Sequence, residues 1–338
     1  MKAEGIGWGK LYIAGEYAVI QPGYPAIILA TDRCIHVSIE PSDRFSLISL
    51  NSGKSVTFDL FDKADGYYSY AISALRIFFE YLDSRNIDHH PVSVTITSDL
   101  DHVDGRKFGL GSSGAIVAAI IKGLNNYFKQ TLDTLTLFKL CVISQLRLNV
   151  QGSFGDLAAA VYGGVIRYTR FEDINSHLPL NVSLEMEWPK LSIEYIDLPK
   201  GLTWIVGWTQ QPSSTQSQVE QVRALIFSPQ YRDYLVDAKN IVDTMVNSSD
   251  AEIFVSGVAR YRQWLNQLEK QAKIEIETPL IKTFIRLCEI YGGAGKSSGA
   301  GGGDCALAFF SHPIKIDDIL VSEGIIPLSI QAASREVV

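Results

Sequence analysis

Glycine, serine and lysine residues gather in three short segments that lie far apart in the chain. The segments run from Gly9 to Tyr17, from Lys107 to Ala115 and from Lys296 to Cys305. Glycine lets the backbone approach a ligand closely, while lysine side chains and free backbone N–H groups attract negative charge. Phosphoryl transfer requires several negative charges to be neutralised and held in line. The three segments together therefore indicate a phosphoryl-transfer enzyme.

The middle segment has the pattern of a strand, a loop and the start of a helix. Alternating residues over 92–98 predict the strand, and apolar residues at helical spacing from Ile116 to Phe128 predict the helix. The N–H groups and dipole at the start of a helix favour an anion. The candidate phosphate-binding residues are therefore Lys107, Gly109, Leu110, Gly111, Ser112, Ser113 and Gly114.

Two other interpretations of the glycine segments are possible. A glycine-serine loop also serves as an ordinary turn, and the middle segment alone leaves that alternative open. Gly295-Lys296-Ser297 looks like the end of a Walker-type loop, but Ile290 stands where that loop requires glycine. The apolar run over 306–310 that follows also predicts a buried strand, whereas a Walker-type loop opens a helix.

Composition agrees with a globular enzyme. The 338 residues are 46% hydrophobic and carry a net charge of −7, which disfavours non-specific binding to nucleic acid. The four cysteines and six histidines have no metal-ligand spacing, so we expect reduced, buried thiols and no zinc-type site. No apolar stretch reaches membrane-spanning length and no secretory signal is evident, which predicts a soluble cytoplasmic protein without a membrane partner.

Periodicity predicts two mixed regions, with a second domain that starts near Gly201. Asn51-Ser52-Gly53 is a good hairpin turn between two of the predicted strands. Strands are expected over 26–40, 45–50, 55–60, 165–169, 202–208, 306–310 and 325–330. Helices are expected over 70–82, 132–146, 231–246, 251–273 and 279–291, with a short one that begins near Ser153.

The three segments, in this order, resemble the GHMP small-molecule kinases. Members of that family have an N-terminal lysine segment, a central Gly-Leu-Gly-Ser-Ser loop and a C-terminal Gly-Ala-Gly-Gly-Gly loop, and the resemblance covers nearly the whole chain. It implies an α+β fold with two domains. Residues 1–200 would form a domain like a ribosomal-protein fold and carry the phosphate loop, and residues 201–338 would form a ferredoxin-like domain.

Within that family, these segments and Gly152 to Ala158 are similar to those of bacterial-type phosphomevalonate kinases. This resemblance implies ATP-dependent phosphorylation of phosphomevalonate to its diphosphate, with Mg²⁺ as cofactor. It also implies small-molecule partners only, no nucleic acid, and a monomer or homodimer. Mevalonate kinases usually have Ser-Ser-Ala where this chain has Ser113-Gly114, and their last motif lacks the equivalent of Asp304.

The resemblance also implies roles for individual residues. Lys10, Lys107 and Asp156 would be catalytic, and Ser113 would bind the metal. Acceptor binding would involve Lys10, Ser153, Ser214, Thr215, Ser298, Gly299, Ala300 and Gly301, although Pro212 to Gln216 departs from the usual Pro-Ala-Ser-Ser-Ser.

Asp156 could orient the acceptor or a lysine, ligate Mg²⁺, or complement a helix N-terminus. An acceptor phosphate is mostly dianionic at neutral pH because its second pKa is about 6. We therefore hypothesise that Asp156 orients Lys10 and the reacting groups, with base catalysis secondary. Glu16 could contact the distal part of the acceptor or pair with a lysine.

Three other functions stay open at this stage. A GHMP kinase with a hydroxyl acceptor, such as mevalonate, is opposed by Gly114 and Asp304. A diphosphomevalonate decarboxylase typically has Gly-Leu-Ala-Ser-Ser in the central loop, unlike this chain. A non-catalytic nucleotide sensor on the same fold is opposed by the intact set of Lys10, Lys107, Ser113 and Asp156.

Overall fold

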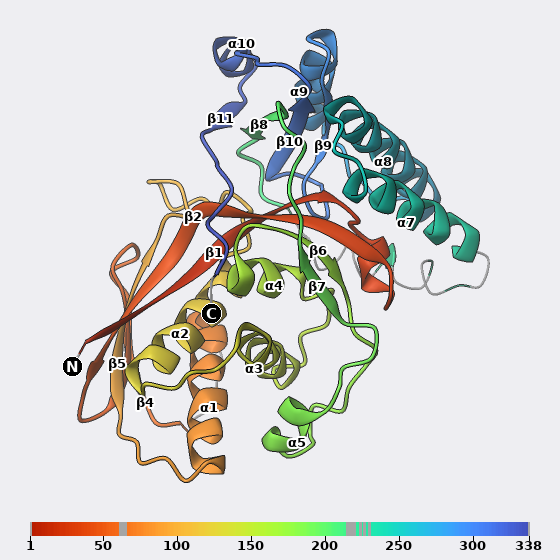
Figure 1. Ribbon diagram of the computed structural model, residues 1–338. Helices are drawn as coiled ribbons and strands as arrows, with labels where there is room; N and C mark the ends of the chain where they lie inside the picture. Colours follow the sequence, from red (N-terminus) through yellow and green to blue (C-terminus); the bar gives the residue numbers. More distant parts are fainter. Residues whose placement is uncertain are drawn as a thin grey trace.

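The computed structural model describes residues 2–60, 66–213, 221, 222, 225, 228 and 231–336. Within these residues the strands form one seven-stranded and one four-stranded sheet. Figure 1 shows the smaller sheet and its helices stacked on one side of the larger sheet, whose own helices cover the other side. The predicted α+β class is confirmed. The predicted domain boundary between residues 200 and 201 stays a prediction.

The larger sheet is organised around its longest strand, β2 (Pro25–Pro41). One edge of β2 pairs with β1 (Ala3–Ala14), and the other pairs with β6 (Val165–Thr169) and β5 (Val92–Ser98) in turn. The sheet is completed by β3 (Phe45–Ser49), β4 (Ser55–Phe58) and β7 (Ser192–Tyr195). All of these pairs are antiparallel except β3 with β5. We call this sheet and its helices the first-sheet region.

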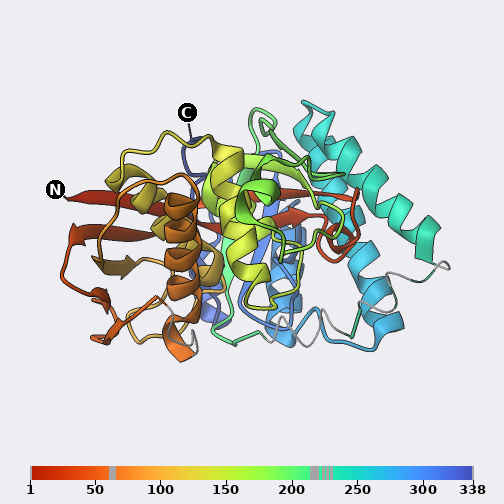
Figure 2. The same cartoon turned by 90° about the horizontal axis from the view of Figure 1, so that it is seen from below.

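Beneath this sheet, helices α2 (Ser112–Tyr127) and α4 (Gly155–Tyr162) pack directly against β1 and β2. Helices α1 (Ser69–Ser84) and α3 (Thr134–Leu146) form a lower layer against these two helices. Figure 2 looks onto this layer and shows α1 (orange) beside α3 (yellow-green). The short elements η1 (Ala18–Ile20), η2 (Gly66–Tyr68) and α5 (Leu180–Glu185) complete the region.

Glycines in β1 let α2 lie directly on the strand. A Cβ atom at Gly7 would lie 1.9 Å from the carbonyl oxygen of Ala115, and one at Gly5 would lie 2.1 Å from that of Ala119. Side chains at these two positions would push the helix away from the sheet. The close approach therefore fixes the start of α2 beside the end of β1, where the backbone N–H of Lys10 donates to the carbonyl of Leu110 at 2.8 Å.

The smaller sheet has the order β11 (Ile326–Leu328), β8 (Thr203–Trp208), β10 (Cys305–Phe310) and β9 (Ala294–Ser297), and all of its pairs are antiparallel. Helices α8 (Ala251–Ala272), α9 (Pro279–Ile290) and α10 (Asp317–Ser322) pack against this sheet. Helix α7 (Arg232–Val246) packs on α8 and contacts β2 of the larger sheet. The third glycine-rich segment is the connection from β9 to β10. We call this sheet and its helices the second-sheet region.

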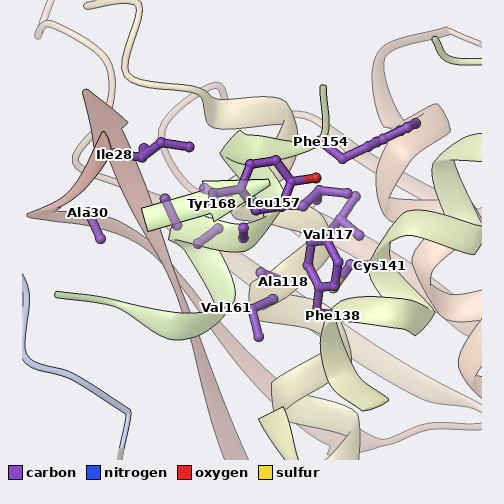
Figure 3. Close-up of a cluster of buried hydrophobic side chains, with 14 of the residues drawn as sticks. Ile28, Ala30, Val117, Ala118, Phe138, Cys141, Phe154, Leu157, Val161 and Tyr168 are labelled. Carbon is purple, nitrogen blue, oxygen red and sulfur yellow. The ribbon is translucent and has the colours of Figure 1, made fainter. Parts of the chain in front are cut away.

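One continuous hydrophobic core joins the two regions. It extends from β2 and the helices below it to α7, α8 and β10, and a smaller core lies between α9, α10 and the second sheet. Figure 3 shows part of the main core, where α2, α3 and α4 meet beneath β2 and β6. The buried side chains there include Ile28, Val117, Phe138, Leu157 and Tyr168. The loops that precede α2 and α4 are therefore attached to a rigid base.

After β11 the chain returns to the first-sheet region, as Figure 1 shows. The N–H of Ala333 donates to the carbonyl of Ala30 at 2.8 Å, and the N–H of Gly164 donates to that of Ala333 at 3.2 Å. The Glu336 carboxylate accepts from the largely buried Lys122 of α2 at 2.7 Å. This return adds a second connection between the regions and holds α2 at its middle.

Most elements predicted from periodicity are present within two residues of their expected ends. The hairpin turn at 51–53 joins β3 to β4 as predicted. The sequence analysis did not identify β1, β7, β9, α5 or α10. Among the described residues, no helix is both long and apolar enough to cross a membrane.

Candidate active site

Lys10 lies where two glycine loops meet. We call residues 108–114 the central glycine loop and residues 298–304 the C-terminal glycine loop. The Lys10 Nζ donates to the carbonyl of Gly109 at 2.8 Å. A Cβ atom at Gly111 would lie 2.9 Å from Lys10 Cγ, and one at Gly299 would lie 3.7 Å from Lys10 Nζ. The ammonium group is therefore shared between the two loops, which are distant in sequence.

A register shift in β1 between Trp8 and Gly9 immediately precedes Lys10. Such an irregularity bends a strand and re-aims the side chains that follow it. A side chain at Gly9 would meet Thr31 Oγ1 at 2.5 Å, so glycine permits this close pairing with β2. The end of β1 thereby places Lys10 beside the start of α2.

The central glycine loop presents unused donors at the start of α2. Gly109 and Gly111 have φ of 80° and 83°, which glycine adopts without strain, and Gly111 is the N-cap. The hydroxyls of the half-buried Ser112 and Ser113 have no hydrogen-bond partner within the part of the chain that the structure describes. The first N–H groups of a helix also lack partners inside it. The loop can therefore bind an anion, as its sequence predicts.

Lys107 is exposed and immediately precedes the buried Phe108. It forms a backbone bridge with Asp101 on the segment that leads into the loop. This position leaves its side chain free to reach a phosphate over the central glycine loop.

Asp156 lies in the first turn of α4 and faces the same loop. A Cβ atom at Gly114 would lie only 2.7 Å from Asp156 Oδ2, so glycine at 114 makes room for the carboxylate. Burial raises the pKa of Asp156, and the positive charge of Lys10 opposes that rise. Asp156 and Lys10 are thus electrostatic neighbours, as the orienting hypothesis requires.

Ser153 is held by two tyrosines at the end of the loop before α4. Its Oγ lies 2.9 Å from Tyr12 Oη, and its carbonyl accepts from Tyr168 Oη at 2.6 Å. Burial raises the pKa of Tyr12, so its hydroxyl stays neutral and can donate. The sequence analysis did not select Tyr12, although it stands two residues after Lys10 and therefore on the same face of the strand.

The C-terminal glycine loop is held from several sides. Ser298 Oγ accepts from the Tyr12 N–H at 2.9 Å, and Tyr17 Oη donates to the carbonyl of Ala300 at 2.6 Å. The N–H of Gly302 donates to the carbonyl of Ile276 at 2.9 Å, and the Ser213 hydroxyl donates to that of Gly301. These contacts place Ser298, Gly299 and Ala300 beside β1, where the sequence predicted an acceptor site.

A buried ion pair lies behind this loop. Lys296 is fully buried and pairs with the Glu16 carboxylate, which is 3% exposed and also accepts from the Gly299 N–H at 3.4 Å. Burial lowers the pKa of Lys296, and Glu16 opposes that effect. Of the two roles considered for Glu16, the structure shows pairing with a lysine. The strand position of Lys296 in β9 also agrees with the exclusion of a Walker-type loop.

Cys305 is buried, and its thiol contacts the carbonyl of Phe108 at 3.1 Å. Burial raises its pKa to about 12, so the thiol is not a nucleophile at neutral pH. The cysteines of the described chain are free, and Cys34 is half-buried where the sequence predicted burial.

The structure brings together most of the residues that the sequence selected. Ser214 and Thr215, selected for acceptor binding, lie outside the described residues. Three neighbours of the site were not selected, although each lies within one of the glycine-rich segments: Tyr12, Lys296 and Asp304. Asp304 in particular is the first residue after the glycine run.

Comparisons with known proteins agree with this geometry. Residues 69–164 match the GHMP kinases N terminal domain, and residues 256–321 match the GHMP kinases C terminal domain. A phosphomevalonate kinase of Streptomyces sp. (strain CL190) is 32% identical, and the alignment covers 96% of each chain. The chain therefore belongs to the GHMP kinase family and is a phosphotransferase, and the family implies a nucleotide substrate.

Solved structures extend the similarity to the whole fold. Streptococcus pneumoniae phosphomevalonate kinase in complex with phosphomevalonate and AMPPNP is 27% identical, with a TM-score of 0.86 over 98% of this chain and 99% of that one. A Listeria innocua protein is 34% identical, with a TM-score of 0.91 over 99% of each chain. A mevalonate kinase of Methanococcus jannaschii, 19% identical at a TM-score of 0.73, shares the fold. The predicted two-domain GHMP kinase fold is confirmed.

Proposed function

We propose that this enzyme transfers the γ-phosphoryl group of ATP to the phosphate of (R)-5-phosphomevalonate and forms 5-diphosphomevalonate, a step toward isoprenoid precursors. The observation that carries the proposal is the position of the Lys10 ammonium group between the two glycine loops. One loop is suited to the donor phosphates and the other to an acceptor phosphate. The similarity to phosphomevalonate kinases along the whole chain supports the choice of acceptor.

The donor side of the site is the central glycine loop. Its free N–H groups at the start of α2 would bind the phosphates of ATP, and Lys107 would bridge donor and acceptor phosphates. Lys10 would neutralise charge on the transferred group. The start of α2 is fixed before the reaction because α2 is packed against β1 without intervening side chains.

The acceptor side combines Ser153 with the backbone of the C-terminal glycine loop. Tyr12 links the two, since its hydroxyl contacts Ser153 and its N–H donates to Ser298. An acceptor phosphate with a second pKa of about 6 is already mostly dianionic at neutral pH. Asp156 then has little need to remove a proton, and its place beside Lys10 supports an orienting role.

The residues present suit Mg²⁺. The Ser113 hydroxyl and the carboxylate of Asp156 are hard oxygen donors near the central loop, of the kind that Mg²⁺ accepts together with nucleotide phosphates and water. Within the described residues there is no cluster of three or more His, Cys, Asp or Glu that could hold a metal by itself, which fits a metal held mainly by phosphates. When bound, the ion would neutralise charge on the phosphate oxygens.

The test is ADP release by purified enzyme with ATP and Mg²⁺, with phosphomevalonate, mevalonate and diphosphomevalonate offered separately. We expect turnover with phosphomevalonate only, and its loss in Lys107→Ala. Turnover with mevalonate would move the assignment to a kinase with a hydroxyl acceptor, and CO₂ release from diphosphomevalonate would identify a decarboxylase. ATP binding without turnover on any of the three would favour a nucleotide sensor. Oligomeric state, monomer or homodimer, would be read from light scattering of the same preparation.

A further inference from the structure

Asp304 is fixed in an uncommon backbone conformation at the end of the C-terminal glycine loop. Its φ is 55°, in the left-handed region that residues other than glycine seldom adopt. Its N–H donates to the carbonyl of Gln211 at 2.7 Å, and its own carbonyl accepts from both the N–H and the hydroxyl of Thr209 at 2.9 Å. Strain of this kind persists where the surroundings over-determine the conformation, often at functional sites.

The Asp304 side chain lies directly on the central glycine loop. A Cβ atom at Gly109 would lie 2.4 Å from Asp304 Cβ and Cγ and 2.5 Å from Oδ2. The next residue repeats the contact, because the Cys305 thiol donates to the carbonyl of Phe108. The second-sheet region thus inserts a carboxylate into the phosphate site, and glycine at 109 leaves the space for it.

The charges around this carboxylate are those of the phosphate site. Asp304 is half-buried, and burial raises its pKa, while Lys10, the Ser213 N–H and Lys107 oppose the rise. Lys10 donates to the carbonyl of the same Gly109 that Asp304 covers. The side chain of Lys10 reaches this loop and Lys107 immediately precedes it, so their positive charges repel each other. The negative charge of Asp304, which both lysines stabilise, offsets that repulsion.

We propose that Asp304 is a positioning residue that holds the ammonium groups of Lys10 and Lys107 over the central glycine loop. It acts through the two lysines in the resting enzyme and during phosphoryl transfer. The effect of Asp304 on phosphoryl transfer rests on the proposed function, but its effect on the placement of the lysines does not. It can therefore be measured without any substrate.

The first experiment measures lysine reactivity in the resting enzyme. A nearby negative charge favours the protonated form of a lysine, which does not react with acylating reagents. We expect Asp304→Asn to increase the rate of acetic anhydride labelling of Lys10 and Lys107 several-fold, quantified by mass spectrometry against the exposed Lys200 as internal reference. Asp304→Glu keeps the charge and should restore part of the protection. Unchanged labelling in Asp304→Asn would overturn the proposal.

Asp101→Asn is the matched control, because Asp101 bridges Lys107 through the backbone but comes from the first-sheet region. If that variant alone increased the labelling of Lys107, Asp101 would be the residue that holds it and the proposal would fail. Thermal unfolding of each variant checks that the fold is retained. An Asp304→Asn protein that loses its cooperative transition would be replaced by Asp304→Ser, measured in the same way.

The second experiment separates positioning from loop structure by kinetics. If Asp304 positions the lysines, Asp304→Asn lowers kcat about 10- to 100-fold, because misplaced cations stabilise the transition state poorly. The KM for ATP should stay constant or fall, since a negative charge near the phosphates has been removed. A raised KM for both substrates with unchanged kcat would show that Asp304 only shapes the loop. Should phosphomevalonate prove not to be the acceptor, the labelling result still decides the placement.

Discussion

Glycine has different structural roles in the central and the C-terminal glycine loops. In the central loop, glycines permit positive φ at the start of a helix, whose first N–H groups have no partner inside the helix. In the C-terminal loop, which joins two strands, the backbone is held by hydrogen bonds from Gly302 to Ile276 and from Ser213 to Gly301, and the Glu16–Lys296 pair lies behind it. The first loop has the features of an anion-binding site, whereas the second is held in place by hydrogen bonds. Disrupting them should therefore give different defects.

The largest effect is expected from Lys296→Met, which leaves the Glu16 carboxylate buried without its partner. Loss of one member of a buried pair typically costs about 3–5 kcal/mol. Urea unfolding should show this loss. KM for the acceptor should rise because Glu16, which accepts from the Gly299 N–H, loses the partner that fixes its carboxylate. The double variant Glu16→Gln with Lys296→Met removes the orphaned charge and should recover part of the stability. Equal stability of the single and double variants would show that the pair does not hold the loop.

Lys10→Met should damage catalysis and leave the fold intact, since this lysine serves both loops. Removal of one group that stabilises transition-state charge typically lowers kcat about 10²- to 10³-fold. Steady-state kinetics with a parallel melting curve would measure both properties. The exposed Lys200→Met is the control, with no change expected in either. A tenfold change in kcat corresponds to about 1.4 kcal/mol of activation free energy. A kcat within two- to threefold of wild type would therefore show that Lys10 has no role in catalysis.

Gly109→Ala tests the contact between the loops. The left-handed φ of 80° would cost an alanine about 1–2 kcal/mol. Its Cβ would also overlap the Asp304 side chain. Activity and melting temperature should therefore both fall. Gly53→Ala is the matched control, because φ there is 66° and no atom lies within 4 Å of the added Cβ, so only the backbone strain remains. Identical behaviour of the two variants would contradict the close approach of Asp304.

Asp156→Asn should change stability least among these variants, and it should raise stability where the others lower it or leave it unchanged. The folded pKa of Asp156 lies above its unfolded value, so ionisation in the folded state costs stability. The contribution of Asp156 is most favourable below the unfolded pKa of about 4 and declines as pH rises through the folded pKa. The melting temperature of the asparagine variant should therefore be higher than that of wild type at pH 7 and equal to it at pH 3.5. Turnover should fall, and near-wild-type turnover would rule out an essential role.

From the sequence, the site residue Lys10 was predicted, but the strand on which it lies was not. Lys10 was selected by resemblance, yet β1 was missed because Gly5, Gly7 and Gly9 weaken the strand pattern. The structure explains these glycines, since α2 occupies the space that their side chains would fill. The packing of α2 on β1 is a tertiary contact, which the local periodicity of the sequence cannot predict.

The partners of the C-terminal loop were unpredictable for the same reason. Glu16 and Lys296 are separated by 280 residues, and nothing in either segment shows which charges meet. The helix after the central loop, in contrast, was predicted from its own apolar spacing and is present as α2. Local pattern therefore predicted the helix that follows the central glycine loop, whereas the contacts that hold the C-terminal glycine loop could be seen only in the fold.

The most direct test of the central claim is the chemical nature of the bond that the enzyme forms. Phosphorus-31 NMR of a reaction with ATP, Mg²⁺ and phosphomevalonate should show the monoester signal replaced by two coupled signals of a new phosphoanhydride as ADP appears. Those signals would show that the acceptor group is a phosphate. A second monoester signal in place of the coupled pair would show transfer to a hydroxyl, and would contradict the account.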